Sequence, residues 1–276
     1  MAVVEAPVAA VGDNCIDRYV PTGRDDTVGG NALNVAVGLV NAGHPTTYLG
    51  AVGGDAEGEL IVRTAEAVGV DMSGVRVLPA HTGVTTVELL PDGERIFRDE
   101  SYGASALFRL EDGDLARLRG CVWVHAANLP GAPAAVLRLA AEEHRVSYDF
   151  SDHGDVALRT ALCPHLAIAF FSAPTETPNG AAGLAQAALA EGAEIAVVTR
   201  GRAGSLAAVH GSLFEQDAVA VEPVETLGAG DAFIAAFISA QVTGESLTES
   251  LRRGAVAAAR TCELVGPWPV AKEVRV

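Results

Sequence analysis

The chain has 276 residues, of which 49% are apolar, and its 35 acidic side chains outnumber 19 basic ones to give a formal net charge of −16. This charge excludes nucleic acid as an expected partner, because phosphate backbones are bound by clustered lysine and arginine. The sequence has no run of about 18 apolar residues that would predict a transmembrane helix. Its N-terminus also lacks the basic stretch of a signal peptide. We therefore expect a cytoplasmic protein with no membrane partner.

Lysine, cysteine and histidine usage excludes several further classes of protein. Lys272 is the only lysine and stands near the C-terminus, so a Walker A loop, a protein-kinase fold and a pyridoxal enzyme would all lack their essential lysine. The four cysteines are scattered without a C-x-x-C pair, and the seven histidines show no zinc-site spacing. Any ligand phosphate must therefore be bound without lysine.

Apolar segments along the chain alternate between strand-like and helix-like patterns. The expected strands are Val8–Gly12, Thr46–Val52, Val122–His125, Val146–Phe150, Leu166–Phe171 and Ile195–Thr199. The expected helices are Ala32–Asn41, Gly58–Val68, Pro133–His144, Gly180–Glu191, Asp231–Gln241 and Leu247–Cys262. This alternation predicts an α/β protein whose mostly parallel sheet is covered by helices on both faces. Ligands of such folds bind outside the carboxyl ends of the strands.

One segment interrupts the alternation. Val84–Leu90 and Arg95–Arg98 flank a turn at Pro91–Glu94, which predicts an antiparallel hairpin. Segments at about 18–28 and 82–102 could together form a small sheet over the site, acting as a lid that excludes water. A plain edge hairpin is the alternative. The absence of a linker or repeat predicts a single domain over the whole chain.

The most informative feature is the run Glu225–Asp231, Glu-Thr-Leu-Gly-Ala-Gly-Asp, which leads directly into an apolar helix. The first N–H groups of a helix have no intrahelical partner and carry partial positive charge. The Gly-Ala-Gly sequence exposes these groups to an anion, and Asp231 places a proton acceptor beside it. Phosphoryl transfer to a hydroxyl requires this combination. The run predicts a small-molecule kinase, and the alternative is an ordinary loop with an acidic first helical turn.

Other polar motifs follow predicted strands. Gly12–Asp17 places the carboxylates of Asp13 and Asp17 where they can accept hydrogen bonds from sugar hydroxyls, the alternative being a solvated turn. Asp149–Asp152 and His125–Asn128 also fall at strand ends and could line the pocket. We expect the histidine of the second motif to be structural, since a single histidine at a strand end more often packs than reacts.

Two glycine-containing motifs predict close approach of a ligand to the backbone. Val28–Asn34 opens a helix with Gly29 and Gly30, the alternative being a plain helix start capped by Asn31. Thr199–Gly204 ends a strand with two glycines and two arginines. That composition suits a phosphate-lined loop in an acidic protein, and a hairpin turn is the alternative.

Taken in order, these motifs resemble those of the ribokinase-like (PfkB) family of carbohydrate kinases, and the resemblance covers nearly the whole chain. It rests on an early Gly-x-x-x-x-Asp, a Gly-Gly-x-x-x-Asn helix start, a Thr-x-Gly-x-x-Gly loop and the Gly-Ala-Gly-Asp run. The resemblance implies a Rossmann-like α/β fold with a small β lid. It also implies ATP and Mg²⁺ as cofactors, a sugar or sugar-amine as substrate, and a possible homodimer through the lid.

Four stretches resemble the fructoselysine kinases within this family, namely Gly12–Asp17, Val124–Ala127, Asp149–Asp152 and Phe171–Pro174. They imply transfer of a phosphoryl group from ATP to fructoselysine, giving fructoselysine 6-phosphate. Two alternatives stay open. The first is a kinase of the same fold for another acceptor, such as a ketohexose, a deoxyketohexonate or a nucleoside. The second is a non-catalytic sugar or nucleotide sensor on the same scaffold.

The resemblance also implies roles for individual residues. Asp231 would be the catalytic base, and Gly228, Ala229 and Gly230 would donate N–H groups to the transferred phosphoryl group. The implied substrate-binding residues are Asp13, Asp17, Gly29, Gly30, Asn34 and Arg98. The implied nucleotide-binding residues are Thr199, Gly201, Gly204 and Thr226, and the implied metal ligand is Glu176.

Three positions depart from the family pattern. Glu225 stands where the family usually has aspartate, and its extra methylene shifts the carboxylate. Ala173 replaces the asparagine of an Asn-x-x-Glu motif, so that only Glu176 of this motif is retained. Asp13 stands where many members have an uncharged residue, and its carboxylate could pair with the amine nitrogen of a fructosamine.

Overall fold

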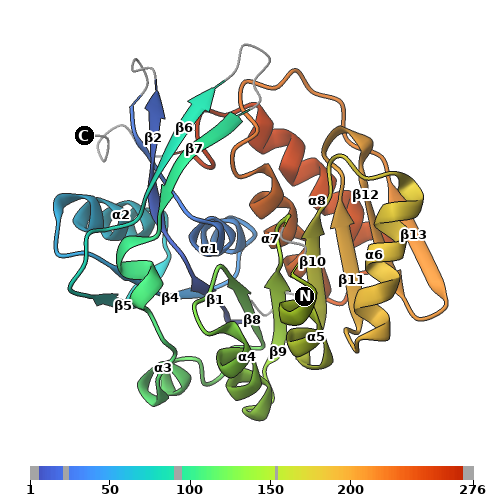
Figure 1. The fold of residues 1–276 in the computed structure, drawn as a ribbon, viewed down its shortest axis with the longest axis horizontal. Coiled ribbons are helices and arrows are strands. Elements are labelled where there is room, and N and C mark those ends of the chain that lie inside the picture. Colours follow the sequence, from blue (N-terminus) through green and yellow to red (C-terminus); the bar gives the residue numbers. More distant parts are fainter. Residues whose placement is uncertain (1–5, 21–24, 90–94, 153–154, 270–276) are drawn as a thin grey trace.

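The structure is a computed structural model that describes residues 6–20, 25–89, 95–152 and 155–269. Its strands are β1 (Val8–Gly12), β2 (Cys15–Val20), β3 (Thr27–Gly29), β4 (Thr46–Val52), β5 (Asp71–Val77), β6 (Val84–Leu89), β7 (Arg95–Ser101), β8 (Trp123–Ala127), β9 (Arg145–Asp149), β10 (Ile168–Ser172), β11 (Ile195–Thr199), β12 (Ser205–Val209) and β13 (Ser212–Gln216). Its α-helices are α1 (Asn31–Asn41), α2 (Ala56–Ala67), α3 (Asp112–Arg117), α4 (Ala132–Ala141), α5 (Val156–Leu162), α6 (Pro178–Ala190), α7 (Ala229–Val242) and α8 (Leu247–Cys262). Figure 1 shows their arrangement.

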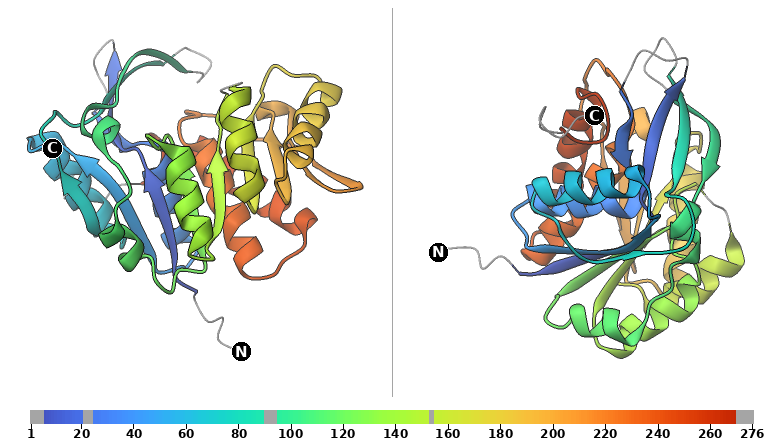
Figure 2. Two further views of the ribbon diagram at one scale, coloured as in Figure 1. Left: turned by 60° about the horizontal axis from the view of Figure 1, so that its bottom comes forward. Right: turned by 90° about the vertical axis from the view of Figure 1, so that its left-hand side faces the viewer.

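The main sheet has nine strands in the order β13-β12-β11-β10-β9-β8-β1-β4-β5. Neighbouring strands from β11 to β5 are parallel, and β12 is antiparallel to both of its neighbours. Successive side chains of β1 enter different cores: Ala9 and Val11 pack with α4 and α6, whereas Val8 packs with α1, α7 and α8. Helices therefore cover both faces of the sheet (Figure 2), which confirms the predicted α/β class.

The strand order reverses direction between β1 and β8. The chain passes from β1 to β4 and β5 on one side, and β8 to β11 lie on the other. Ligands of such sheets bind at this point, outside the carboxyl ends of the strands. The two strands are in close contact here, because a Cβ atom at Gly12 would lie 1.8 Å from the carbonyl oxygen of Ala127.

A second sheet of four strands, in the order β3-β2-β6-β7, projects from the body of the molecule (Figures 1 and 2). The chain leaves β1 through Asp13 and Asn14 to enter β2, and β3 returns it to the start of α1. The predicted hairpin strands correspond to β6 and β7, while the predicted turn at 91–94 lies outside the described residues. The role of this sheet as a lid stays a prediction, as does the single-domain organisation.

Several helix boundaries differ from the prediction because of local capping. Helix α7 begins at Ala229 rather than Asp231, since Gly228 at φ 75° is its N-cap. Helix α2 begins two residues early because the side chain of Asp55 accepts a hydrogen bond from the Gly58 N–H group. The sequence reasoning missed β5, β12, β13, α3 and α5, which are short or lie at sheet edges. No helix in the described part of the chain is long and apolar enough to cross a membrane.

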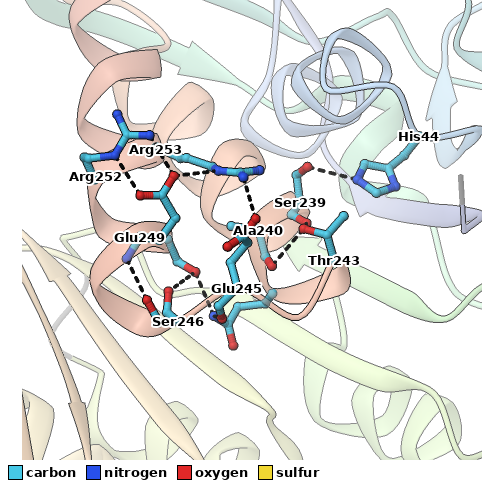
Figure 3. Close-up of polar contacts among 11 residues, drawn as sticks. His44, Ser239, Ala240, Thr243, Glu245, Ser246, Glu249, Arg252 and Arg253 are labelled. Atoms are coloured by element: carbon cyan, nitrogen blue, oxygen red, sulfur yellow. Dashed lines mark hydrogen bonds and ion pairs between the residues drawn. The ribbon is translucent and has the colours of Figure 1, made fainter. Parts of the chain in front are cut away.

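A polar network holds the C-terminal end of α7 against α8 and the segment after α1 (Figure 3). The Oγ of Ser239 lies 2.9 Å from Nε2 of His44, and Ser246 caps α8 by accepting a hydrogen bond from the Glu249 N–H group. The carboxylate of Glu249 accepts hydrogen bonds from Arg252 and Arg253. The contacts of Glu249 lie within α8, whereas the Gln241 side chain donates a hydrogen bond of 2.7 Å to the Ser250 hydroxyl and joins the end of α7 to α8.

Candidate active site

The N-terminus of α7 is open on its outer side. Its N-cap, Gly228, adopts φ 75°, and a Cβ atom there would lie 2.5 Å from the Cβ of Pro267. Gly230, in the first turn, is exposed, and a Cβ there would meet no atom of the described residues within 4 Å. The helix start is therefore open at Gly230, where an anion can approach the first N–H groups of this 14-residue helix.

Asp231 is held from the first turn of α1. The Asn34 amide nitrogen donates a hydrogen bond of 2.7 Å to Oδ2 of Asp231, and the Asn34 amide oxygen accepts one of 2.9 Å from the Trp268 indole nitrogen. Asn34 is buried, and Asp231 is half-buried. The structure thus brings together two predicted site residues that are 197 positions apart in the sequence. The sequence reasoning missed Trp268, which belongs to none of the motifs described above.

Glu225 connects the loop before α7 to the projecting sheet. Its carboxylate is fully buried and accepts hydrogen bonds from the Tyr19 hydroxyl at 2.5 Å and from the Gly266 N–H group at 3.1 Å. Burial, followed by the bond to this carboxylate, raises the pKa of Tyr19. Leu227 packs with Tyr19 and Val87. Strand β2 and the Gly-Ala-Gly loop are therefore in direct contact.

The glycine pair before α1 makes room for the chain's own groups. A Cβ at Gly29 would lie 2.1 Å from Oδ2 of Asp17, and a Cβ at Gly30 would lie 2.4 Å from Cα of Asn14. Gly30 also has φ 108°, a conformation that favours glycine. These close contacts require glycine at both positions, and the role of the pair in substrate binding stays a prediction. Asp17 itself is buried at the start of β2, beside the glycine pair.

Asp13 caps α1. Its Oδ1 accepts a hydrogen bond of 3.0 Å from the Ala32 N–H group, and its Oδ2 accepts one of 3.1 Å from the Asn128 side chain. Burial raises the pKa of this carboxyl group against the effect of these bonds. Asn31, the cap in the alternative interpretation of this motif, instead donates to Oδ2 of Asp149 at 2.6 Å. Asp13 and Asn128 thus meet at the point where the strand order reverses.

Arg98 lies on β7, in the projecting sheet. It forms an ion pair with Glu88 on the neighbouring strand. Glu88 is paired with Val20 in the register of β2 and β6, so it faces the same side as Arg18 and the side opposite Asp17 and Tyr19. The geometry gives Arg98 a cross-strand partner within its own sheet, and its role in substrate binding stays a prediction.

The predicted nucleotide loop is a tight connection between β11 and the antiparallel strand β12. Gly201 and Gly204 adopt φ 55° and 86°, and a Cβ at Gly204 would lie 2.2 Å from the carbonyl oxygen of Gln216. Arg200 closes the loop, since its N–H group donates to the Gly204 carbonyl and its guanidinium to that of Ala203. The hairpin turn named as the alternative is therefore present, at the same sheet edge as Asp13.

The remaining predicted residues line this edge or the helices beside it. The Thr199 hydroxyl donates a hydrogen bond of 3.3 Å to the Phe171 carbonyl, and the Thr226 carbonyl accepts one of 3.3 Å from Ala229. Glu176 is exposed beside the first turn of α6, where a Cβ at Gly180 would lie 2.1 Å from its Oε2. The described residues contain no group of three or more His, Cys, Asp or Glu side chains that could hold a metal ion.

His125 is structural, as expected. It is fully buried in the core, its Nδ1 lies 3.0 Å from the Ser147 hydroxyl, and its ring packs edge-on against Phe170. Burial lowers the pKa of His125 to about 3, so the ring is neutral at physiological pH.

Comparison with known proteins identifies the family of this chain. Residues 21–270 match the model of the pfkB family carbohydrate kinases. Fructoselysine 6-kinase of Escherichia coli is 36% identical over 95% of this chain and 99% of that protein. Fructosamine kinase FrlD of Bacillus subtilis is 32% identical over 94% of this chain and 92% of that protein.

A solved structure of Arabidopsis thaliana ribokinase complexed with ribose and ATP has the same fold. It superposes with a TM-score of 0.83 and 26% identity over 95% of this chain and 94% of that one. The fold, the order of the motifs and nearly full-length similarity agree with the predicted resemblance and confirm it. The chain belongs to the pfkB family and is a carbohydrate kinase.

Proposed function

We propose that this chain transfers the γ-phosphoryl group of ATP to the primary hydroxyl of a fructosamine, with fructoselysine as the acceptor and fructoselysine 6-phosphate as the product. The choice of acceptor is supported by the similarity to two kinases named for fructoselysine and fructosamine, each over more than nine tenths of both chains.

The observation that carries the chemistry is the Asn34–Asp231 pair at the open N-terminus of α7. Asp231 accepts the proton of the sugar hydroxyl as that oxygen attacks the γ-phosphorus. The bond from the γ-phosphorus to the bridging oxygen of ADP breaks, and ADP leaves with that electron pair. The N–H groups at Gly228–Gly230 stabilise negative charge on the transferred group. The fold therefore holds both the proton acceptor and the N–H donors in position before the reaction begins.

The residues fit a nucleotide carried with Mg²⁺. The start of α7 offers N–H groups over open space, as an anion site requires. Mg²⁺ is commonly bound through one or two carboxylates together with substrate phosphates and water, and the exposed Glu176 is our proposed ligand. When bound, the ion would neutralise part of the negative charge of the ATP phosphates. The chain is acidic and has a single lysine, so its own side chains offer little positive charge for this.

Acceptor-dependent release of ADP from Mg-ATP tests the proposal. The panel is fructoselysine, fructose, ribose and no acceptor, with kcat/KM measured for each. A preference of at least about tenfold for fructoselysine is the expected result. Turnover of fructose or ribose alone would keep the kinase and overturn the acceptor. ADP release that no acceptor stimulates, together with tight binding of a sugar, would favour the sensor instead.

The predicted contact between Asp13 and the substrate amine needs a variant that keeps the cap of α1. Asp13→Asn retains an oxygen for the Ala32 N–H group and removes the charge. If Asp13 recognises the amine, kcat/KM for fructoselysine falls and that for fructose does not. Equal losses for both acceptors would leave Asp13 with the capping role alone.

Three further predictions concern the whole molecule. The homodimer through the lid would use β7, one of the two edge strands of the projecting sheet, where Phe97 is 44% exposed. Light scattering on the purified chain distinguishes one copy from two. Closure of the lid and the cytoplasmic location likewise stay predictions.

A further inference from the structure

Trp268 is linked to the proposed base through a single side chain. Its indole N–H group donates to the amide oxygen of Asn34, and the amide nitrogen of Asn34 donates to Oδ2 of Asp231. The three residues come from the C-terminal segment, the first turn of α1 and the first turn of α7. The relay therefore joins three parts of the chain that are distant in sequence.

The direction of the first bond determines the direction of the second. An asparagine amide has an accepting oxygen and a donating nitrogen, and its orientation follows from its partners. An indole N–H can only donate, so Trp268 requires the oxygen of Asn34 to face it. The nitrogen then faces Asp231, which as a carboxylate can only accept. The reversed orientation would place the amide oxygen against the carboxylate.

Packing holds Trp268 in place, while Asn34 itself has room to rotate. Trp268 is 5% exposed and packs in the core beside α1, and its segment is tied down by the bond from Gly266 to Glu225. A cavity of about 100 Å³ is lined by Asn34, Gly228 and Trp268, among others. Space of that size can admit water. Packing alone therefore leaves the amide free to reverse, and its orientation is selected by the indole N–H group together with the Asp231 carboxylate.

We propose that Trp268 is a positioning residue of this kinase, which orients the Asn34 amide so that Asp231 is presented to the sugar hydroxyl. The inference rests on the assignment of Asp231 as the base. It predicts an effect on the chemical step and none on nucleotide binding, because the relay ends at the carboxylate.

The test compares the chain's two tryptophans. Trp268→Phe removes the indole N–H group of the relay. Trp123→Phe removes the buried indole N–H bond of 2.9 Å to Ser147, in the core between β8 and β9. Both variants should lose similar thermal stability. Only Trp268→Phe should lower kcat, by about tenfold, as expected for one misdirected hydrogen bond, with KM for ATP within about twofold of wild type.

A double-mutant cycle shows whether Trp268 acts through Asn34. In an Asn34→Ala background, Trp268→Phe should change kcat by less than about twofold, since the relay is already broken. Effects that multiply in full, or equal kcat for the two tryptophan variants, would overturn the proposal. Trp268→Tyr is a second variant without the indole N–H group, for use if the phenylalanine variant does not fold.

The assays use fructoselysine with Mg-ATP, or whichever acceptor of the panel the wild-type chain phosphorylates, since the inference concerns the base. Asp231→Asn is measured alongside. If Asp231→Asn keeps near-normal turnover, the base assignment fails and the inference fails with it. If Asp231→Asn is inactive while Trp268→Phe matches wild type, the inference fails alone.

Discussion

The two ends of helix α7 are built from different chemistry. Its N-terminal end has a glycine as N-cap and an exposed glycine in the first turn. Two carboxylates lie there, and each accepts a hydrogen bond from a buried side chain: Asp231 from Asn34, and Glu225 from Tyr19. Its C-terminal end is surrounded by hydroxyl groups and lies beside α8, where Glu249 forms ion pairs with Arg252 and Arg253 (Figure 3).

This difference indicates that the N-terminal end of α7 is the candidate site and that the C-terminal end has a structural role. At the first turn the Ala229 N–H group bonds the Thr226 carbonyl, and the N–H groups beside it have no intrahelical partner and can meet a ligand. The side chains that hold Asp231 and Glu225 are buried, where an unsatisfied polar group is costly. At the other end, most charged groups are partly exposed, where water can replace a lost partner. Substitutions at the N-terminal end should therefore change activity or stability strongly, and those at the C-terminal end should change little.

The largest effect is expected at Asp231. Asp231→Asn keeps the shape and removes the proton acceptor, so kcat should fall by about 10²–10⁴-fold, the usual contribution of a positioned base. Sugar binding, measured by calorimetry, should be largely kept. Turnover near that of wild type would remove Asp231 from this role.

Gly230 tests whether the open space above α7 receives the nucleotide. Gly230→Ala meets no atom of the described residues within 4 Å, so folding should be unaffected. A methyl group over the phosphate position should lower kcat/KM for ATP by about tenfold or more.

A matched control for Gly230 lies in α6. Gly183→Ala also meets no described atom within 4 Å. It should raise the free energy of unfolding by about 0.5–1 kcal/mol through helix propensity, with ATP kinetics unchanged. Equal ATP kinetics in the two variants would place the phosphates elsewhere.

Tyr19→Phe should destabilise the contact between β2 and the loop before α7. It leaves the buried Glu225 carboxylate without one of its donors, which costs about 1–3 kcal/mol in the free energy of unfolding. We also expect KM for the acceptor to rise, because β2 carries Asp17 as well. Tyr102→Phe, at a tyrosine that is 41% exposed, is the control for urea unfolding. Equal stability of both variants would show that the Tyr19–Glu225 bond contributes nothing.

The smallest effect is expected at Glu249. Arg252, followed by Arg253, lowers the pKa of Glu249 from 4.5 to about 2. A carboxyl group whose pKa is lowered by folding stabilises the protein above its unfolded pKa and loses that contribution as pH falls toward the folded value. Glu249→Gln should therefore lower Tm slightly at pH 7, with the difference from wild type shrinking between pH 4.5 and 2. A difference that grows in this range would contradict the expected ionisation.

Much of the fold followed from local patterns. Segments with buried apolar positions, such as β4, β11 and α8, lie at their predicted residues, because a buried strand or an amphipathic helix leaves a strong sequence signal. Strand β13 and helix α5 were missed for the opposite reason. The first lies at a sheet edge with mostly exposed side chains, and the second has only seven residues. Neither presents enough apolar positions to show a period.

The sequence predicted the motifs that make up the candidate site better than the contacts between them. The Gly-Ala-Gly-Asp run was predicted at a helix N-terminus because the glycines and the apolar helix that follows them are adjacent in the sequence. The glycine pair before α1 was interpreted as room for a ligand, which stays a prediction, and the structure shows that a Cβ at either glycine would meet Asp17 or Asn14. A glycine in a sequence motif indicates that there is no room for a Cβ atom at that position. It does not indicate whether a ligand or another part of the chain takes up the space.

The sequence by itself determined the α/β class, the order of the motifs, the absence of an interior lysine and the position of Asp231 at the start of a helix. Each of these depends on residues that are close together or on composition. Only the tertiary structure showed that Tyr19 reaches Glu225 and that Trp268 reaches Asn34, pairs that are 206 and 234 residues apart. Such contacts are selected by the packing of whole helices and sheets, and no local pattern in one sequence encodes which distant side chains that packing brings within hydrogen-bond distance.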